Sequence, residues 1–171
     1  MKESPRYFGV YRGTVIDNID PLNIGRILAT VPDVSGLTPT TYAMPCIPIA
    51  GKLMGTFMVP QIGAGVWVQF EAGDPDRPVW SGGWWGSAAE VPALALAGVP
   101  GDPNYVIQTT LQNAIVVSDL AGPTGGIMLK STTGATIIVN DTGIYIQNGK
   151  GASIVMTGPT VTINEGALVV V

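Results

Sequence analysis

From residue 126 to the last residue, short apolar runs alternate with glycines at intervals of about eight residues. The runs are rich in Ile, Val and Thr, which favour β-strands, and glycine readily adopts the positive φ of a tight turn. A short, fixed repeat of strand and turn is typical of a β-solenoid or β-prism. Such a segment builds a rod and has no room for an active site. We expect six glycines at the corners of this needle: Gly126, Gly134, Gly143, Gly151, Gly158 and Gly166.

The length of the repeat predicts the oligomeric state. Eight residues supply one short strand and one turn, whereas a coil of a single-chain solenoid usually needs about 20 residues or more to enclose a core. Three chains that wind together can enclose one, so we expect each strand to pair with a strand of a neighbouring chain. A monomer would expose unpaired strand edges and a large apolar face. Residues 106–171 are therefore predicted to form an intertwined trimeric β-helix, a triangular prism and an obligate homotrimer.

The alternative for the same strands is a compact β-sandwich, which would need charged outer faces. From residue 106 onward there is only about one charge per repeat, and most of these charges lie beside the glycines. This distribution favours the prism. The charged residues of the segment are Asp119, Lys130, Asp141, Lys150 and Glu165.

Residues 1–86 show a different pattern, with about five strand-like runs of unequal length separated by Gly and Pro. The strongest runs are 65–70 and 79–84. Several short strands in roughly 85 residues predict a small barrel, which closes its own sheet edges. Residues 87–105 are rich in Ala, Gly and Pro and are expected to be a linker, so the whole chain is predicted to be all-β.

Composition narrows the possible functions. Apolar residues make up 46% of the chain and charged residues only 12%, so much of its surface must be buried against something. No apolar run reaches the ~18 residues of a membrane-spanning helix, and the first six residues do not resemble a secretory signal. The net charge of −4 argues against binding to a phosphate backbone.

The chain contains no histidine, the commonest general base and a common metal ligand. We therefore expect no enzymatic activity, no metal and no cofactor. The single cysteine, Cys46, lies between prolines and is expected to be a buried structural thiol. Asp74 and Asp76 near Glu71 can be interpreted as an acid–base or metal pair, but a hairpin turn neutralised by Arg77 explains them better.

A second carboxylate pair, Asp17 and Asp20, is also expected to belong to a turn. The aromatic residues of the barrel segment have two interpretations, as a base-stacking platform or as barrel core plus a docking surface. The lack of a basic groove favours the second. Because adjacent residues of a strand point to opposite faces, we expect one of Trp84 and Trp85 in the core and the other against a hub protein or a neighbouring protomer.

Three sequence stretches and one motif carry a resemblance to a known family. Residues 25–32, 60–71 and 73–82, together with the motif Met44-Pro45, resemble the OB-fold domain of the phage baseplate protein V and VgrG spike family. The string Gly-Asp-Pro-Asp-Arg-Pro at 73–78, between two strands, is the most specific part. The glycine repeat resembles the trimeric β-helical needle of the same family, so the resemblance covers nearly the whole chain.

The resemblance implies an N-terminal OB-fold barrel, followed by the needle, in a structural central spike of a contractile tail baseplate. It implies a homotrimer that docks on a hub protein at the tip of the tail tube and pierces the target membrane. The expected location is a virion tail baseplate or a phage-like injection particle, assembled in the host cytoplasm. The linker is too short to hold the lysozyme domain of some members.

The iron site at the tip of some phage spikes uses histidines and is not carried over to this chain. The end of the repeat is apolar instead, and we expect it to be a platform for a PAAR-type cap protein. The residues of this tip are Leu168, Val169, Val170 and Val171. The alternatives to a spike are an OB-fold nucleic-acid-binding protein and a cell-wall hydrolase.

Overall fold

The structure is a computed structural model that describes residues 5–170. The chain forms two compact units, one extending to Ala88 and one beginning at Ala89. Strands dominate both units and the helical segments are single turns, so the all-β prediction is confirmed. Among the described residues, no helix is long and apolar enough to cross a membrane.

A five-stranded sheet forms the first unit, with the strand order β2-β1-β6-β7-β3. All neighbours are antiparallel except β3 and β7, which are parallel. A separate two-stranded hairpin consists of β4 and β5. The bounds are β1 (Tyr11–Asp17), β2 (Leu28–Thr30), β3 (Met44–Pro45), β4 (Ala50–Gly51), β5 (Met54–Gly55), β6 (Gly65–Phe70) and β7 (Pro78–Trp84).

The sheet closes on itself next to its two edge strands. Ile27, beside β2, forms an antiparallel bridge to Ala43, beside β3, which joins the two ends of the sheet. The one-turn helix α1 (Pro32–Ser35) follows β2. Inward-facing side chains fill the interior, as alternation along a strand requires. The buried core consists of Val15, Ile27, Ala29, Val31, Ala43, Val66, Val68, Phe70 and Trp80.

Turns in this unit are held by carboxylates. After β6, the short 3-10 turn η1 (Glu71–Gly73) leads into a turn in which the Asp76 amide donates to Asp74 Oδ1 at 3.1 Å. Arg77 forms an ion pair with Glu71 across it, so the interpretation of this motif as a neutralised turn is confirmed. Cys46 is exposed, and the expectation of a buried thiol is wrong, because Cys46 follows the exposed Met44 by two residues and so lies on the same outward side of the strand.

Asp20 organises the loop between β1 and β2. Asp20 is 8% exposed, and its carboxylate accepts hydrogen bonds from three backbone amides and from Arg26 Nε and Nη2, at 2.9 and 2.7 Å. The Arg26 guanidinium in turn lies 4.6 Å from the centre of the Tyr42 ring. Hydrogen bonding by Arg26 holds the pKa of Asp20 well below its usual range. These contacts are those of a turn.

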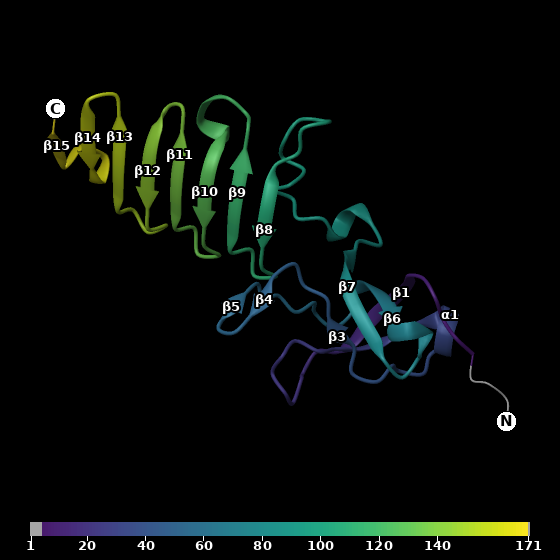
Figure 1. The fold of residues 1–171 in the computed structure, drawn as a ribbon. Coiled ribbons are helices and arrows are strands. Elements are labelled where there is room, and N and C mark those ends of the chain that lie inside the picture. Colours follow the sequence, from purple (N-terminus) through teal and green to yellow (C-terminus); the bar gives the residue numbers. More distant parts are fainter. Residues whose placement is uncertain (1–4, 171) are drawn as a thin grey trace. The chain divides into compact units, whose positions relative to one another are not determined.

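The second unit is a single eight-stranded antiparallel sheet in which each strand pairs with the next in sequence (Figure 1). Three 3-10 turns, η2 (Ala88–Glu90), η3 (Gly122–Thr124) and η4 (Asn164–Gly166), accompany it, η2 beginning just before the boundary of the unit. The bounds of the strands are β8 (Tyr105–Gln108), β9 (Ala114–Ser118), β10 (Gly126–Lys130), β11 (Thr136–Asn140), β12 (Gly143–Gln147), β13 (Ser153–Thr157), β14 (Thr160–Ile163) and β15 (Leu168–Val170).

Strand pairing in this sheet differs from the expectation. Each pair from β8–β9 to β14–β15 is hydrogen-bonded within one chain. The expectation that each strand pairs with a strand of a neighbouring chain is therefore wrong for these strands. The reason is the short glycine turn, which returns the chain directly beside the strand it has left, as a hairpin does.

Candidate functional site

One face of the second sheet carries two continuous rows of apolar side chains. The register places an apolar residue opposite an apolar residue at every step, from the first strand to the last. One row consists of Tyr105, Val117, Ile127, Val139, Ile144, Met156, Val161 and Val170. The other row consists of Ile107, Ile115, Leu129, Ile137, Ile146, Ile154, Ile163 and Leu168.

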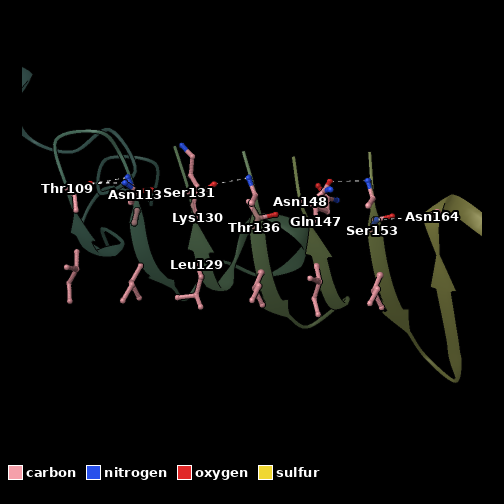
Figure 2. Close-up of a pocket in the computed structure, with 18 of the residues that line it drawn as sticks. Thr109, Asn113, Leu129, Lys130, Ser131, Thr136, Gln147, Asn148, Ser153 and Asn164 are labelled. Atoms are coloured by element: carbon pink, nitrogen blue, oxygen red, sulfur yellow. Dashed lines mark hydrogen bonds between the residues drawn. The ribbon is translucent and has the colours of Figure 1, made fainter. Parts of the chain in front are cut away.

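These sixteen side chains, which we call the apolar face, are only partly covered. In the second row, the exposed fractions of Ile115, Leu129, Ile137, Ile146 and Ile154 are all between 36 and 46%. A groove of about 940 Å³ runs along this row. Figure 2 shows Leu129 standing in line with the apolar side chains of neighbouring strands. Isolated exposed apolar residues are common on proteins, but a contiguous face of this size marks an interaction surface.

The opposite face has a different composition. It carries a central row that ranges from Val116 and Met128 to Tyr145, flanked by polar positions such as Thr136 and Gln147. The two faces of each five-residue strand thus differ in polarity, as expected for a sheet that buries one side. The apolar face is the side that lacks polar residues within the strands.

Asparagine side chains hold the turns at one end of the strands of this sheet. The Thr132 amide donates to Asn113 Oδ1, and the Ser153 amide donates to Asn164 Oδ1, both at 3.0 Å. Asn148 Oδ1 accepts from two amides within its own turn. Figure 2 shows Asn113, Asn148 and Asn164 at this end of the strands, apart from the apolar row. Polar side chains therefore satisfy the backbone of the turns, and they do not interrupt the apolar face.

The repeat glycines lie in or next to the turns between strands. Five have positive φ, from 52° at Gly158 to 157° at Gly143, and Gly166 ends η4. Gly126 and Gly143 are also crowded, because a Cβ there would lie 2.1 and 2.3 Å from a carbonyl oxygen of the adjacent strand. The role of all six repeat glycines at the corners of an assembled needle stays a prediction. The glycines concerned are Gly126, Gly134, Gly143, Gly151, Gly158 and Gly166.

Most of the expected tip belongs to β15, an edge strand of the sheet. Leu168 and Val170 are more than half exposed and continue the two rows of the apolar face. Val169 pairs with Thr162. Val171 lies outside the described residues, and cap docking at this strand stays a prediction.

Trp84 and Trp85 occupy different environments in the barrel. Trp85 follows β7 and is 63% exposed. Trp84 is half-buried but lies outside the core. Its ring centre is 6.5 Å from that of Trp67. The core tryptophan is Trp80, whose Nε1 donates to the Gly25 carbonyl at 3.1 Å. Neither member of the Trp84–Trp85 pair is therefore a core residue. Arg12 was not predicted from the sequence, and its guanidinium lies beside both Trp67 and Trp84.

Acidic residues form no recognisable metal site in the described part of the chain, where no group of three or more Asp, Glu, Cys or His side chains comes together. Asp17, Asp20 and Asp74 instead accept hydrogen bonds from backbone amides of their turns, and Glu71 pairs with Arg77. The most extended candidate site in the described part of the chain is the apolar face, which is a binding surface.

Comparison with protein-family models gives two matches. Residues 11–85 match the type VI secretion system/phage-baseplate injector OB domain. Residues 104–169 match the phage baseplate V C-terminal trimerisation domain. These ranges contain the strands of the barrel and nearly all of the eight-stranded sheet. A search among curated proteins found no match.

Proposed function

The chain belongs to the phage baseplate V family of injector spikes, and from this premise we propose that it forms the trimeric central spike of a contractile tail baseplate. A structural role in the baseplate follows from the family itself. Docking on a hub protein, piercing of the target envelope, capping of the tip and assembly in the host cytoplasm are the further parts of the proposal.

The apolar face is the observation that carries the proposal. Its two rows run through all eight strands without a polar residue. Full burial of one aliphatic side chain contributes about 1.5–3 kcal/mol, so leaving the face in water is costly. Three copies can cover their faces by forming a triangular prism with one sheet on each side. The match of this segment to a trimerisation domain supports the same number of chains.

This trimer differs from the one expected from the sequence. Each side of the prism is a sheet of one chain, and the chains associate through side chains instead of sharing strands. The backbone hydrogen bonds then link one strand to the next along the axis of the needle. Eight strands at about 4.8 Å per step give a needle on the order of 35 Å long.

A spike of this kind acts mechanically. When the tail contracts, the axial load on the spike passes through the ladder of backbone hydrogen bonds and through the packed apolar interior. The turns lie at the ends of the strands, where asparagine side chains hold them. In the proposed orientation the barrel meets the hub, the needle points to the target membrane, and β15 with Val171 receives a PAAR-type cap.

Labelling of intact particles tests this proposal. Antibodies against the chain, applied to purified contractile particles, should label the end of the tail tube at the baseplate. Deletion of its gene should give particles that fail to inject, and the wild-type gene should restore injection. Label along the sheath, or normal injection by particles that lack the chain, would contradict the proposal.

A further inference from the structure

A cationic side chain lies against two indole rings on the outer face of the barrel. The Arg12 guanidinium carbon is 5.6 Å from the centre of Trp67 and 5.2 Å from that of Trp84. Arg12 and Trp67 face each other in the register of β1 and β6. Contacts of this kind favour the cation electrostatically and restrict its motion. We call these three residues the Arg–Trp cluster.

A β-bulge places Trp84 in this cluster. In β7, Trp80 points into the core, and an uninterrupted strand would point Trp84 to the same side. The register shifts between Val66 and Val68, so that Val68 pairs with Trp80 and Val66 with Gly83. The extra residue in β7 reverses the alternation, and Trp84 therefore lies on the outer face. Bulges often redirect a side chain next to a functional site.

Two further contacts fix the ring of Trp84. Its Nε1 donates to the Val66 carbonyl at 3.2 Å. The ring covers Gly65, where a Cβ would come within 2.6 Å of the indole. A side chain at position 65 would displace the ring. The orientation of Trp84 thus depends on the bulge, on a hydrogen bond and on the glycine beneath it.

The Arg12 guanidinium has no carboxylate partner in the described part of the chain. The ion pairs found there use Arg26 and Arg77 instead. Arg12 is exposed, although its guanidinium lies against the indole rings. A guanidinium held in this way keeps N–H donors at its edge that match the two oxygens of a carboxylate. Its positive charge favours an acidic group on the partner.

We propose that the Arg–Trp cluster is the hot spot by which the barrel docks on the hub protein, and that it binds a carboxylate side chain of the hub. Trp and Arg are enriched among the few residues that dominate binding energy at interfaces. The exposed Trp85, next to the cluster, adds apolar contact area. This inference rests on the proposed function, because it assumes that the barrel docks on a hub.

Binding of the full-length spike to the purified hub protein of the same particle tests the inference. Arg12→Ala should weaken binding at least tenfold and make it less dependent on salt, and Arg12→Lys should recover only part of the loss, because lysine lacks the planar guanidinium. Arg6→Ala is the matched control, since Arg6 is also exposed and, within residues 5–170, its side chain donates a hydrogen bond to the Ala72 carbonyl at 3.4 Å. It should bind like the wild type. Equal melting temperatures confirm that the variants are folded.

The outcomes separate this inference from the proposed function. If the wild-type spike does not bind the hub, both fail. If the wild type binds and Arg12→Ala binds within twofold of it, the inference is overturned and docking stands. If Arg12→Ala instead reduces the mass of the spike, the cluster is a contact between copies of this chain, which also overturns the inference. Restoration of binding to Arg12→Glu by an acidic-to-lysine change in the hub supports it.

Discussion

The barrel and the eight-stranded sheet bury their apolar residues in opposite ways. In the barrel, alternate side chains point into a closed interior, and Ile27, Val66 and Val68 are completely buried within one chain. In the sheet, Ile137 and Ile146 occupy equally regular positions but keep 43 and 36% of their surface exposed. Both regions follow the same alternation along the strand. They differ in whether the sheet closes on itself.

This difference shows which of the two units needs other chains to bury its apolar residues. A closed barrel satisfies its own strand edges and encloses its core within one chain. An open meander encloses no core of its own, so its apolar face depends on another surface to cover it. The trimer is therefore a consequence of the second unit, whereas the barrel is free to present its outer face, including Arg12 and Trp84, to a different protein.

The largest effect is expected from a charge on the apolar face. Ile137→Asp places a carboxylate in the interior of the proposed prism, where burial of an unpaired charge is prohibitive. Sedimentation velocity should show loss of the trimer. Thr157→Asp, at an exposed position on the opposite face that does not line the groove, is the matched control and should remain trimeric. Dissociation by both variants, or by neither, would break the distinction between the two faces.

The next effect concerns the barrel core. Trp80→Ala removes a buried indole and its hydrogen bond to Gly25, and it should cost about 3–5 kcal/mol in the free energy of unfolding of the barrel. Trp85→Ala removes an equally large but exposed side chain and should change this free energy by less than about 0.5 kcal/mol. Calorimetric unfolding measures both. Similar losses would mean that Trp85 is part of a core.

A smaller effect separates two kinds of repeat glycine. Gly126→Ala combines a φ of 85° with a Cβ only 2.1 Å from the Val139 carbonyl oxygen, so the backbone must move. Gly151→Ala has a φ of 99° but open space around the new methyl group. We expect a cost of about 1–2 kcal/mol for Gly151→Ala and at least twice as much for Gly126→Ala. Thermal unfolding of the two variants tests this order, and equal costs would contradict it.

The smallest effect is a pH dependence of the barrel. Because Arg26 lowers the pKa of Asp20 in the folded state, the carboxylate contributes stability above its unfolded pKa of about 3.9. This contribution is lost as the pH falls through the lower pKa of the folded state. Asp20→Asn retains one acceptor oxygen but loses the charge, so its melting temperature should be a few degrees below that of the wild type at pH 7. The difference should shrink below pH 4, and a constant difference would contradict this role.

The sequence predicted the broad architecture because its signals are local. Turn residues such as Asp74 and Asp76, and the alternation in residues 65–70, depend only on their neighbours along the chain. The repeat of glycines likewise predicted the strands of the second unit. What the repeat length could not decide was whether a strand pairs with its own chain or with another, because both arrangements use the same strands and turns.

The Arg–Trp cluster was not predictable from the sequence for a related reason. Simple alternation from the buried Trp80 places Trp84 inside the barrel, and only the register of β6 and β7 reveals the bulge that turns it outward. Arg12 is 55 residues away from Trp67 in the sequence and is brought to it by the pairing of β1 with β6. A signal was present in the two glycines before Trp84, since glycines inside a strand often mark a bulge.

The mass of the purified wild-type chain in solution tests the central claim most directly. If the apolar face is the trimer interface, light scattering after size exclusion should give 53.1 kDa, three times the 17.7 kDa of one chain. This mass should persist on dilution, because the interface runs through all eight strands. A stable, soluble species of 17.7 kDa would contradict the account, since it would show that the sheet tolerates its apolar face in water.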